Sequence, residues 1–480
     1  MVPGTSRRNL LRTAAVAAAL PVLAACEPGD PPPASATAAP LGLSFPPGFV
    51  WGAATSAYQI EGAAALDGRG PSIWDTFCRR PGSIVDGSSG DVACDHYHRW
   101  PEDLDLMKEL GIASYRFSIS WPRVLPSGRG QVNQAGLDFY RRLLDGLHQR
   151  GIAPVATLFH WDLPQTLQDE GGWENRDCAS WFADYAALLF DELGALVPTW
   201  LTINEPKTIV EVGYTYGVMA PGKTDRYAAA TAAHHLALAH GLAVDAFRAA
   251  GSPGRIGPAL NLSPAYPDTE DAEAAARRAD GAQNRLYLDP ILLGRYPEDL
   301  DAFLGSGPAE ALRRAVRDGD LAVIGAPVDV LGVNYYNPVV VDADGNTVDK
   351  FPTSVAAWEQ IYPQGLADLL LRLTRDYPSL PLIITENGIP DPGSLGPVNG
   401  IVDDHGRIDY VRDHLAAAHA AIQAGARLEG YHLWSLLDNF EWAEGYTQRW
   451  GIIHVDFSTQ RRTPKDSAHW YAGVIRRNGV

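Results

Sequence analysis

Cysteine is scarce in this chain of 480 residues, with four, at positions 26, 78, 94 and 178. So low a density excludes the disulfide framework of small secreted domains, and none of the spacings matches a zinc site. Cys78 and Cys94 could pair if the protein is exported; three buried thiols at 78, 94 and 178 are the alternative. The cysteines therefore predict no metal centre and leave one disulfide open.

Lysine and arginine are also in deficit. They number 39 against 57 aspartates and glutamates, so the formal net charge is −18. An acidic surface repels the phosphates of DNA and RNA, which argues against nucleic acid as a partner.

A hydrophobic run long enough to cross a membrane is missing. The apolar stretch from Ala14 to Ala25 is too short to span a bilayer core of roughly 30 Å as a helix. It follows a twin arginine in "TSRRNLLR" (5–12), an order typical of an export signal, and the arginine pair favours the twin-arginine route. "LAAC" (23–26) also resembles a bacterial lipobox, in which Cys26 carries a lipid. An ordinary cleaved signal is the alternative.

These patterns divide the chain into three parts. Residues 1–25 are predicted to be an export signal, and 26–42 a lipidated cysteine with a Pro/Ala-rich tether. Residues 43–480 are expected to form one catalytic domain. The predicted location is a cell-surface lipoprotein or a secreted protein, with membrane contact only through the lipid on Cys26.

From residue 43 onward, short β-branched runs alternate with Ala-, Leu- and Arg-rich helical stretches, which predicts a parallel sheet of βα units. No Gly-rich phosphate loop follows the first run, which argues against an open dinucleotide-binding sheet. The sequence therefore predicts an α/β fold, a single (β/α)₈ TIM barrel. The expected strands are Phe49–Ser56, Ala113–Trp121, Ala153–Trp161, Thr199–Glu205, Arg255–Leu262, Asp329–Tyr336, Leu382–Gly388 and Leu428–Leu436.

Polar and aromatic side chains gather at the expected C-terminal strand ends, which meet at one mouth in such a barrel. Ordinary turns would favour Gly, Asn, Asp and Ser there. The polar or aromatic residues at these strand ends are Gln59, Arg116, His160, Asn204, Glu205, Tyr336, Glu386 and Trp434. Tryptophans expected at or just past strand ends are Trp51, Trp121, Trp161, Trp434 and Trp442. An indole face can stack on the apolar face of a sugar ring.

Two glutamates directly end β-branched runs, Glu205 in "WLTINEP" and Glu386 in "LIITENG". They belong to the fourth and seventh expected strands and so face each other across the mouth. Paired carboxylates in a cleft suit cleavage of a glycosidic bond, one as acid and one as nucleophile or base. Two structural, ion-paired acids are the alternative.

Six motifs together resemble glycoside hydrolase family 1, the retaining β-glucosidases. They are "FVWGAATSAYQIEGA", "YRFSISWPR", "LFHWDLPQ", "TINEP", "ITENG" and "HLWSLLDNFEWAEGY". They occur in the family's order and extend the resemblance from about Phe45 to Tyr471.

The resemblance implies that Glu205 is the general acid/base and Glu386 the nucleophile. Glu205 would hold its proton in the free enzyme, and Glu386 would stay ionised with support from Arg116 and the Tyr336 hydroxyl. No cofactor and no metal are implied. The substrates would be small oligosaccharides or aryl and alkyl β-glycosides. A sugar-binding protein without catalysis and an enzyme that mainly transfers sugars are the alternatives.

The resemblance also assigns the sugar contacts. Asn204 would donate to the 2-hydroxyl, and Trp434 would lie beneath the ring. The 3-, 4- and 6-hydroxyls would meet Gln59, His160, Glu441 and Trp442. Trp358, in a loop one residue longer than is usual, is a candidate platform for the leaving group.

Glu441 narrows the expected substrate to unphosphorylated sugars. Family members that act on 6-phosphorylated sugars usually have a small hydroxyl residue there and a lysine in the following loop. Here the position is acidic and the loop has Gln448, so a phosphate would be repelled. Glucose remains open against galactose and fucose.

A metal site at His96 and His98 is the remaining alternative. The pair precedes a predicted helix, Pro101–Ile112, whereas barrel metallohydrolases carry such a pair at the end of the first strand. No metal site is therefore predicted there.

Overall fold

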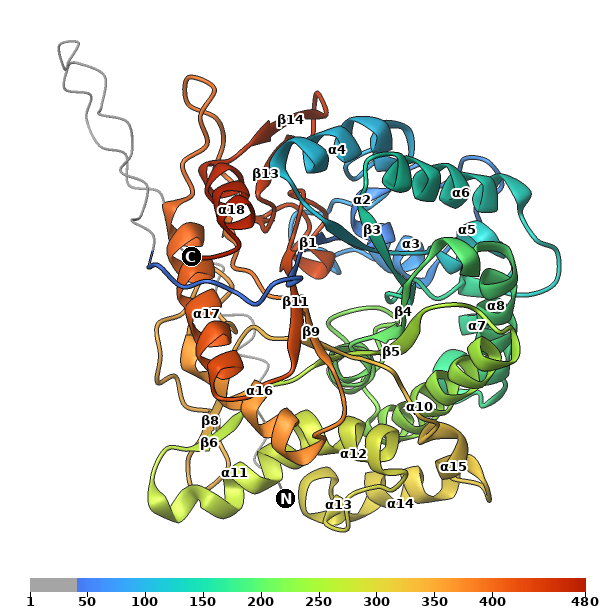
Figure 1. Ribbon diagram of the computed structural model, residues 1–480. Coiled ribbons are helices and arrows are strands. Elements are labelled where there is room, and N and C mark those ends of the chain that lie inside the picture. Colours follow the sequence, from blue (N-terminus) through green and yellow to red (C-terminus); the bar gives the residue numbers. More distant parts are fainter. Residues whose placement is uncertain (1–40) are drawn as a thin grey trace.

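The computed structural model describes residues 41–480, and they form a closed barrel of eight parallel strands surrounded by helices (Figure 1). Neighbouring strands follow the order β1-β11-β9-β7-β5-β4-β3-β2 around the barrel. The predicted (β/α)₈ barrel is confirmed, and all eight expected strands are present with slightly shorter ends. They are β1 (Val50–Ala54), β2 (Ser114–Ser118), β3 (Ala153–Phe159), β4 (Thr199–Asn204), β5 (Arg255–Asn261), β7 (Leu331–Asn334), β9 (Leu382–Glu386) and β11 (Leu428–Trp434).

At least one helix follows each barrel strand and covers its outer face (Figure 1). In α6 the buried side chains recur every three or four residues, so one apolar stripe faces the barrel. The outer layer contains α4 (His96–Leu110), α6 (Gln134–Gln149), α8 (Asp177–Leu193), α10 (Arg226–Ala249), α12 (Leu286–Leu293), α16 (Pro363–Asp376), α17 (His405–Gln423) and α18 (Asp466–Arg477).

Shorter elements lie in the loops between strands and outer helices. The helices are α2 (Ala57–Ile60), α3 (Ile73–Cys78), α5 (Trp121–Val124), α7 (Gln165–Asp169), α9 (Pro206–Thr208), α11 (Glu273–Asp280), α13 (Leu300–Leu304), α14 (Ser306–Ala315) and α15 (Asp320–Ile324). Three small sheets pair β6 (Ala265–Pro267) with β8 (Val339–Val341), β10 (Asp391–Pro392) with β12 (Gln448–Arg449), and β13 (Ile453–Asp456) with β14 (Arg461–Pro464).

The barrel strands are buried on both faces, which explains their continuous apolar character. Every residue of β2 and β4 is buried. The two ends of the domain are tied together, since Leu43 and Val480 exchange backbone hydrogen bonds of 2.9 Å.

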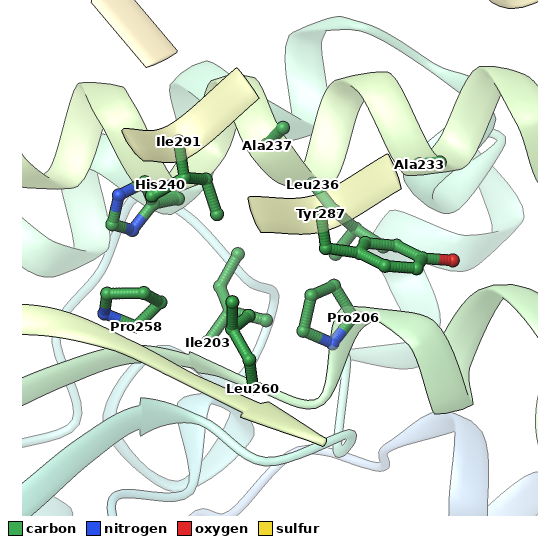
Figure 2. A pocket seen from close by; sticks show the side chains of 10 residues that line it. All are labelled: Ile203, Pro206, Ala233, Leu236, Ala237, His240, Pro258, Leu260, Tyr287 and Ile291. Carbon is green, nitrogen blue, oxygen red and sulfur yellow. The ribbon is translucent and has the colours of Figure 1, made fainter. Parts of the chain in front are cut away.

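Apolar side chains fill the space between the barrel wall and the helices. Figure 2 shows this packing behind β4 and β5, where side chains of α10 and α12 meet Ile203 and Leu260. His240 of α10 borders the same small cavity, and its Nδ1 bonds to Thr202 Oγ1 at 2.7 Å. This cavity lies outside the barrel and is separate from its mouth.

The helix expected at Pro101–Ile112 begins earlier, at His96, so Pro101 lies inside α4 and not in its first turn. The prediction that the two histidines precede the helix is therefore wrong. His96 Nδ1 bonds to Asp103 at 2.7 Å, and Asp103 in turn accepts from Arg462 at 2.9 Å. His96 is thereby part of a buried ion-pair cluster. Gly111 ends the helix with φ +77°, as expected for its glycine C-cap.

Two tryptophans expected near the mouth lie elsewhere. Trp51 is at the start of β1, the opposite end of the barrel, where its ring packs 4.9 Å from Phe45. Trp121 is fully buried and stacks on Tyr185 of α8 at 4.9 Å. Sequence position alone could not distinguish these two tryptophans from those expected to stack on a sugar, because all of them lie near strand ends.

The predicted export signal and Cys26 lie outside the described residues, as does nearly all of the predicted tether. Among residues 41–480, no helix is long and apolar enough to cross a bilayer. Cys78, Cys94 and Cys178 are free thiols. The structure therefore contains no Cys78–Cys94 disulfide.

Trp121→Ala should lower the free energy of unfolding by about 3–5 kcal/mol, because it leaves a large cavity between barrel and helix layer. Trp358→Ala is the matched control: its side chain is 50% exposed, and the change should stay within about 0.5 kcal/mol. Chemical denaturation measures both. Equal losses would contradict the assignment of Trp121 to the core.

Candidate active site

Glu386 ends β9 inside the barrel mouth, where a cation and a phenol hold its carboxylate. Arg116, fully buried on β2, donates from Nη1 to Oε1. The Tyr336 hydroxyl donates to Oε2 at 2.7 Å. Gly388, two residues later, must be glycine, because a Cβ there would lie 1.8 Å from the carbonyl oxygen of Trp434. In the sequence "ENG", the Glu386 carboxylate is thus held by its partners, and the backbone of Gly388 passes close to the backbone of Trp434.

Glu205 follows β4 directly and is surrounded by neutral donors. Asn334 Nδ2 donates to Oε1 at 2.7 Å, and Thr208 Oγ1 donates to Oε2 at 2.8 Å. Asn261 Nδ2 approaches Oε2 at 3.4 Å. The backbone of Glu205 is left-handed, with φ +48°, a conformation that costs energy in a residue with a side chain and is common at active sites.

A hydrogen-bond network through Asn204 joins the two carboxyls. Its Oδ1 accepts from Arg116 Nη2 at 2.6 Å and from Asn334 Nδ2 at 3.0 Å, so its amide nitrogen must face His160. His160 Nε2 therefore accepts at 2.9 Å, and the ring proton lies on Nδ1. That N–H is buried and has no hydrogen-bond partner among residues 41–480.

Gln59, on α2 just beyond β1, connects the first strand end to the loop after β11. Its Nε2 donates to Asn439 Oδ1 at 2.9 Å and to Glu441 Oε2 at 3.3 Å. Ser56 Oγ donates to Gln59 Oε1 at 2.6 Å. The predicted hydroxyl-binding pair, Gln59 and Glu441, is thus brought together by the structure.

Aromatic rings gather beside these polar groups. His160 lies nearly parallel to both Trp434 and Trp442, with ring centroids 5.9 Å apart in each case. Trp161 packs 4.6 Å from Trp442. Trp358 stands at the rim, half exposed, with its ring 5.9 Å from Tyr336. The predicted site residues therefore converge on one mouth.

Known proteins share this architecture. The family model for glycosyl hydrolase family 1 matches residues 42–480. The chain belongs to this family. Relatives include beta-glucosidase A of Acetivibrio thermocellus, 48% identical over 449 residues, covering 91% of this chain and 99% of the relative. Thermostable beta-glucosidase B of Thermobispora bispora is 49% identical over 460 residues, 93% and 94% of the two chains.

A solved structure of this glycosyl hydrolase family superposes closely on the chain. The beta-glucosidase from Thermotoga maritima in complex with deoxynojirimycin has a TM-score of 0.86 and 44% identity, covering 91% of this chain and 100% of that one. The fold is therefore that of a glycoside hydrolase.

Burial dominates the electrostatics of this family 1 site. It raises the pKa of Glu386 to about 7, opposed by Arg116 and reinforced by the charge of Glu205. Burial also raises the pKa of Glu441 well above its usual range, and Glu386 adds to the rise. Burial and Glu205 thus oppose the expected ionised state of Glu386, which Arg116 and the Tyr336 hydroxyl support. Burial and Arg116 lower the pKa of His160, which keeps the imidazole neutral.

Sequence reasoning missed four neutral residues of the site. Asn334 ends β7 and bonds both Asn204 and Glu205. Asn439 holds Gln59, while Thr208 and Asn261 bond Glu205. Asn334 and Asn261 could have been predicted as site residues, because each is a polar residue that ends an apolar strand. Asn439 lies in a loop, where polar residues are ordinary, and Thr208 ends the short helix α9.

Tyr336→Phe should move the acid limb of the kcat/KM profile to higher pH by about one unit, because a hydrogen bond that lowers the pKa of Glu386 is lost. The nucleophile must be ionised to react, so activity would then need a higher pH. A pH series with an aryl β-glucoside measures the shift. Tyr335→Phe is the control, since its hydroxyl bonds to the Tyr362 carbonyl at 2.7 Å. Identical profiles for both variants would contradict the assignment.

Proposed function

We propose that this protein is a retaining β-glucosidase that hydrolyses terminal, non-reducing, unphosphorylated β-D-glycosides. The observation that carries the proposal is the unequal support of its two carboxyls. Glu386 faces a guanidinium, which favours an anion, while Glu205 has only neutral hydrogen-bond partners. A retaining glycosidase needs this pair: an anionic nucleophile, and a carboxyl that can carry a proton.

The first step forms a covalent glycosyl-enzyme. Glu386 attacks the anomeric carbon while Glu205 gives its proton to the departing glycosidic oxygen. Asn204, fixed by Arg116 and His160, can donate its remaining amide hydrogen to the 2-hydroxyl, a contact that strengthens in the transition state. Trp434 supports the sugar face, and His160, whose ring lies nearly parallel to that of Trp434, contacts a ring hydroxyl.

The second step releases the sugar. Once Glu386 is esterified its negative charge is gone, so Glu205 can keep its own charge and act as base on water. Water attacks the anomeric carbon from the side that the leaving group vacated, which regenerates Glu386 and retains the β configuration. With both carboxyls and their donors in place, catalysis explains the site better than sugar binding alone. Transfer to a second sugar would use the same residues.

Unphosphorylated substrates suit the charges around Glu441. Its carboxyl accepts from Gln59 Nε2 at 3.3 Å and offers a 6-phosphate no positive charge, and Gln448 supplies no cation either. Arg449 of the same loop is already engaged, donating to Asp438 Oδ2 at 2.9 Å and to the Val455 carbonyl at 3.0 Å.

Export is the remaining part of the proposal. The twin arginine before an apolar run and the "LAAC" segment support transport by the twin-arginine route and a lipid on Cys26. The enzyme would then act on glycosides outside the cytoplasm, at the cell surface or as a secreted protein.

Glu386→Gly should lower turnover of an aryl β-glucoside by roughly a thousandfold or more, the scale of losing a catalytic nucleophile. Added azide should then yield the α-glucosyl azide, because it attacks from the side that Glu386 occupied. Product analysis by NMR checks the configuration. Glu310→Ala, an exposed glutamate on α14, is the control and should keep full activity without azide products.

Glu205→Ala should slow both steps but still form the glycosyl-enzyme with an activated leaving group, which needs little protonation. Azide should then give the β-glucosyl azide, since it takes the position of the attacking water. The same azide configuration from both variants would overturn the assignment of roles.

Cys26→Ala should release the enzyme from the membrane fraction into the soluble exported fraction, because the lipid would have no attachment point. Cell fractionation with an activity assay checks this, with Cys178→Ala as control. A Cys26→Ala protein that stays on the membrane would refute lipid anchoring.

A further inference from the structure

A fully buried carboxyl just beyond β3 has no part in the chemistry above. Asp162 has no exposed surface, and neither of its carboxyl oxygens has a hydrogen-bond partner among residues 41–480. The Ser120 hydroxyl approaches this carboxyl, but within the described part of the chain it too forms no well-aligned hydrogen bond. Burying an ionised carboxyl without donors costs far more than burying a neutral one. The surroundings of Asp162 therefore favour its protonated form.

The strongest charges that act on Asp162 belong to two balanced ion pairs. Arg69 Nη1 donates to Asp75 Oδ2 at 2.9 Å, and Arg123 Nε donates to Glu61 Oε2 at 2.8 Å. The side chains of both pairs are at most 5% exposed. Each arginine is thus neutralised by its own acid, and an ionised Asp162 would add a net negative charge to the interior.

The remaining polar surroundings of Asp162 give the same result. Tyr185 of α8 also faces Asp162, but its hydroxyl is directed at two backbone carbonyls, at 3.1 Å each. Burial raises the pKa of Asp162 to about 8, opposed by the Ser120 hydroxyl and by Arg69 and reinforced by the charge of Glu61. Geometry and charge therefore agree that Asp162 is neutral at neutral pH.

Asp162 follows a strained turn that carries two rings of the active site. Trp161 has φ +79°, a left-handed conformation that costs energy in a residue with a side chain and persists only when its surroundings hold it. On one side, Trp161 Nε1 donates to the Asn204 carbonyl at 2.9 Å, and His160 bonds to the Asn204 amide at 2.9 Å. On the other side lie Asp162 and Leu163, whose carbonyl accepts from the first residue of α3 at 2.8 Å. The position of both rings therefore depends on how the chain is held after Trp161.

We propose that Asp162 is a positioning residue which, as an uncharged acid, holds the turn of His160 and Trp161 in place and releases it on losing its proton. Ionisation would leave an uncompensated charge behind the sugar site, and water would reach that charge only if the turn moved. The two rings would then lose their fixed positions, and activity would fall at alkaline pH. The inference rests on the proposed β-glucosidase function and adds a pH-sensitive group outside its two reacting carboxyls.

The first test compares the wild type with Asp162→Asn, a neutral side chain of the same shape. Both enzymes keep Glu205 and Glu386, so the ionisation of those groups cancels in the ratio of the two kcat/KM values on p-nitrophenyl β-glucoside. The ratio of variant to wild type should be constant from about pH 5 to 7 and rise above pH 8, by about tenfold per pH unit where the wild type alone loses a proton. Asp245→Asn, exposed on α10, is the matched control and should give a flat ratio.

The second test measures the proton through stability. The unfolded chain loses it near the ordinary pKa of 3.8 and the folded chain near 8, so in between the folded wild type holds one proton more than the unfolded chain. Raising the pH through this window should destabilise the wild type relative to Asp162→Asn, by about tenfold per pH unit in the unfolding equilibrium constant. Chemical denaturation at a series of pH values gives this ratio.

A kcat/KM ratio for Asp162→Asn that stays flat across the alkaline range would overturn the positioning role, and a flat stability ratio would overturn the proton on Asp162. Should Asp162→Asn not fold, Ser120→Ala decides. It removes a hydroxyl that lowers the pKa of Asp162, so its kcat/KM relative to the wild type should rise in the same alkaline range, and a flat ratio would again contradict the proposal. A wild-type enzyme that does not cleave the glucoside at any pH would instead refute the proposed function.

Discussion

The site depends on one buried guanidinium. Arg116 has no exposed surface and reaches from β2 to both Glu386 and Asn204. It offsets part of the cost of burying a carboxylate at the centre of the barrel, and it orients the amide that in turn fixes the tautomer of His160. One charge on β2 thus holds the Glu386 carboxylate, orients the Asn204 amide and helps to keep the His160 imidazole neutral.

A second charge network holds the loop after β11, which carries Asn439 and Glu441. Asp438 accepts from Lys465 Nζ at 2.8 Å and from Arg449 Nη1 at 2.9 Å. The next residue, Asn439, holds Gln59, and Glu441 follows two residues later. Because Asp438 and Lys465 are fully buried, breaking their ion pair would leave an uncompensated buried charge, which favours a single position of the loop.

The two sides of the mouth differ in character. The sugar side is closed, with Gln59, His160 and Asn204 almost wholly buried and bonded to one another or to backbone. The other side carries Trp358, whose side chain is half exposed. Closely bonded groups beside an exposed ring suit an enzyme that recognises one sugar and tolerates variation in what it is attached to.

The sequence by itself determined the barrel, its eight strands and the two glutamates, because parallel barrel strands must be apolar on both faces and "TINEP" and "ITENG" interrupt that pattern with carboxyls. The sequence could not show that Trp434 lies at the mouth while Trp51 and Trp121 do not. A tryptophan near a strand end gives the same sequence pattern whether its ring faces the mouth, the opposite end of the barrel or the helix layer. Only the tertiary structure decided those positions, and with them the pKa of Glu386. That pKa depends on how completely water is excluded and on which charges from distant segments lie within a few ångströms, and neither is encoded in the spacing of residues along the chain.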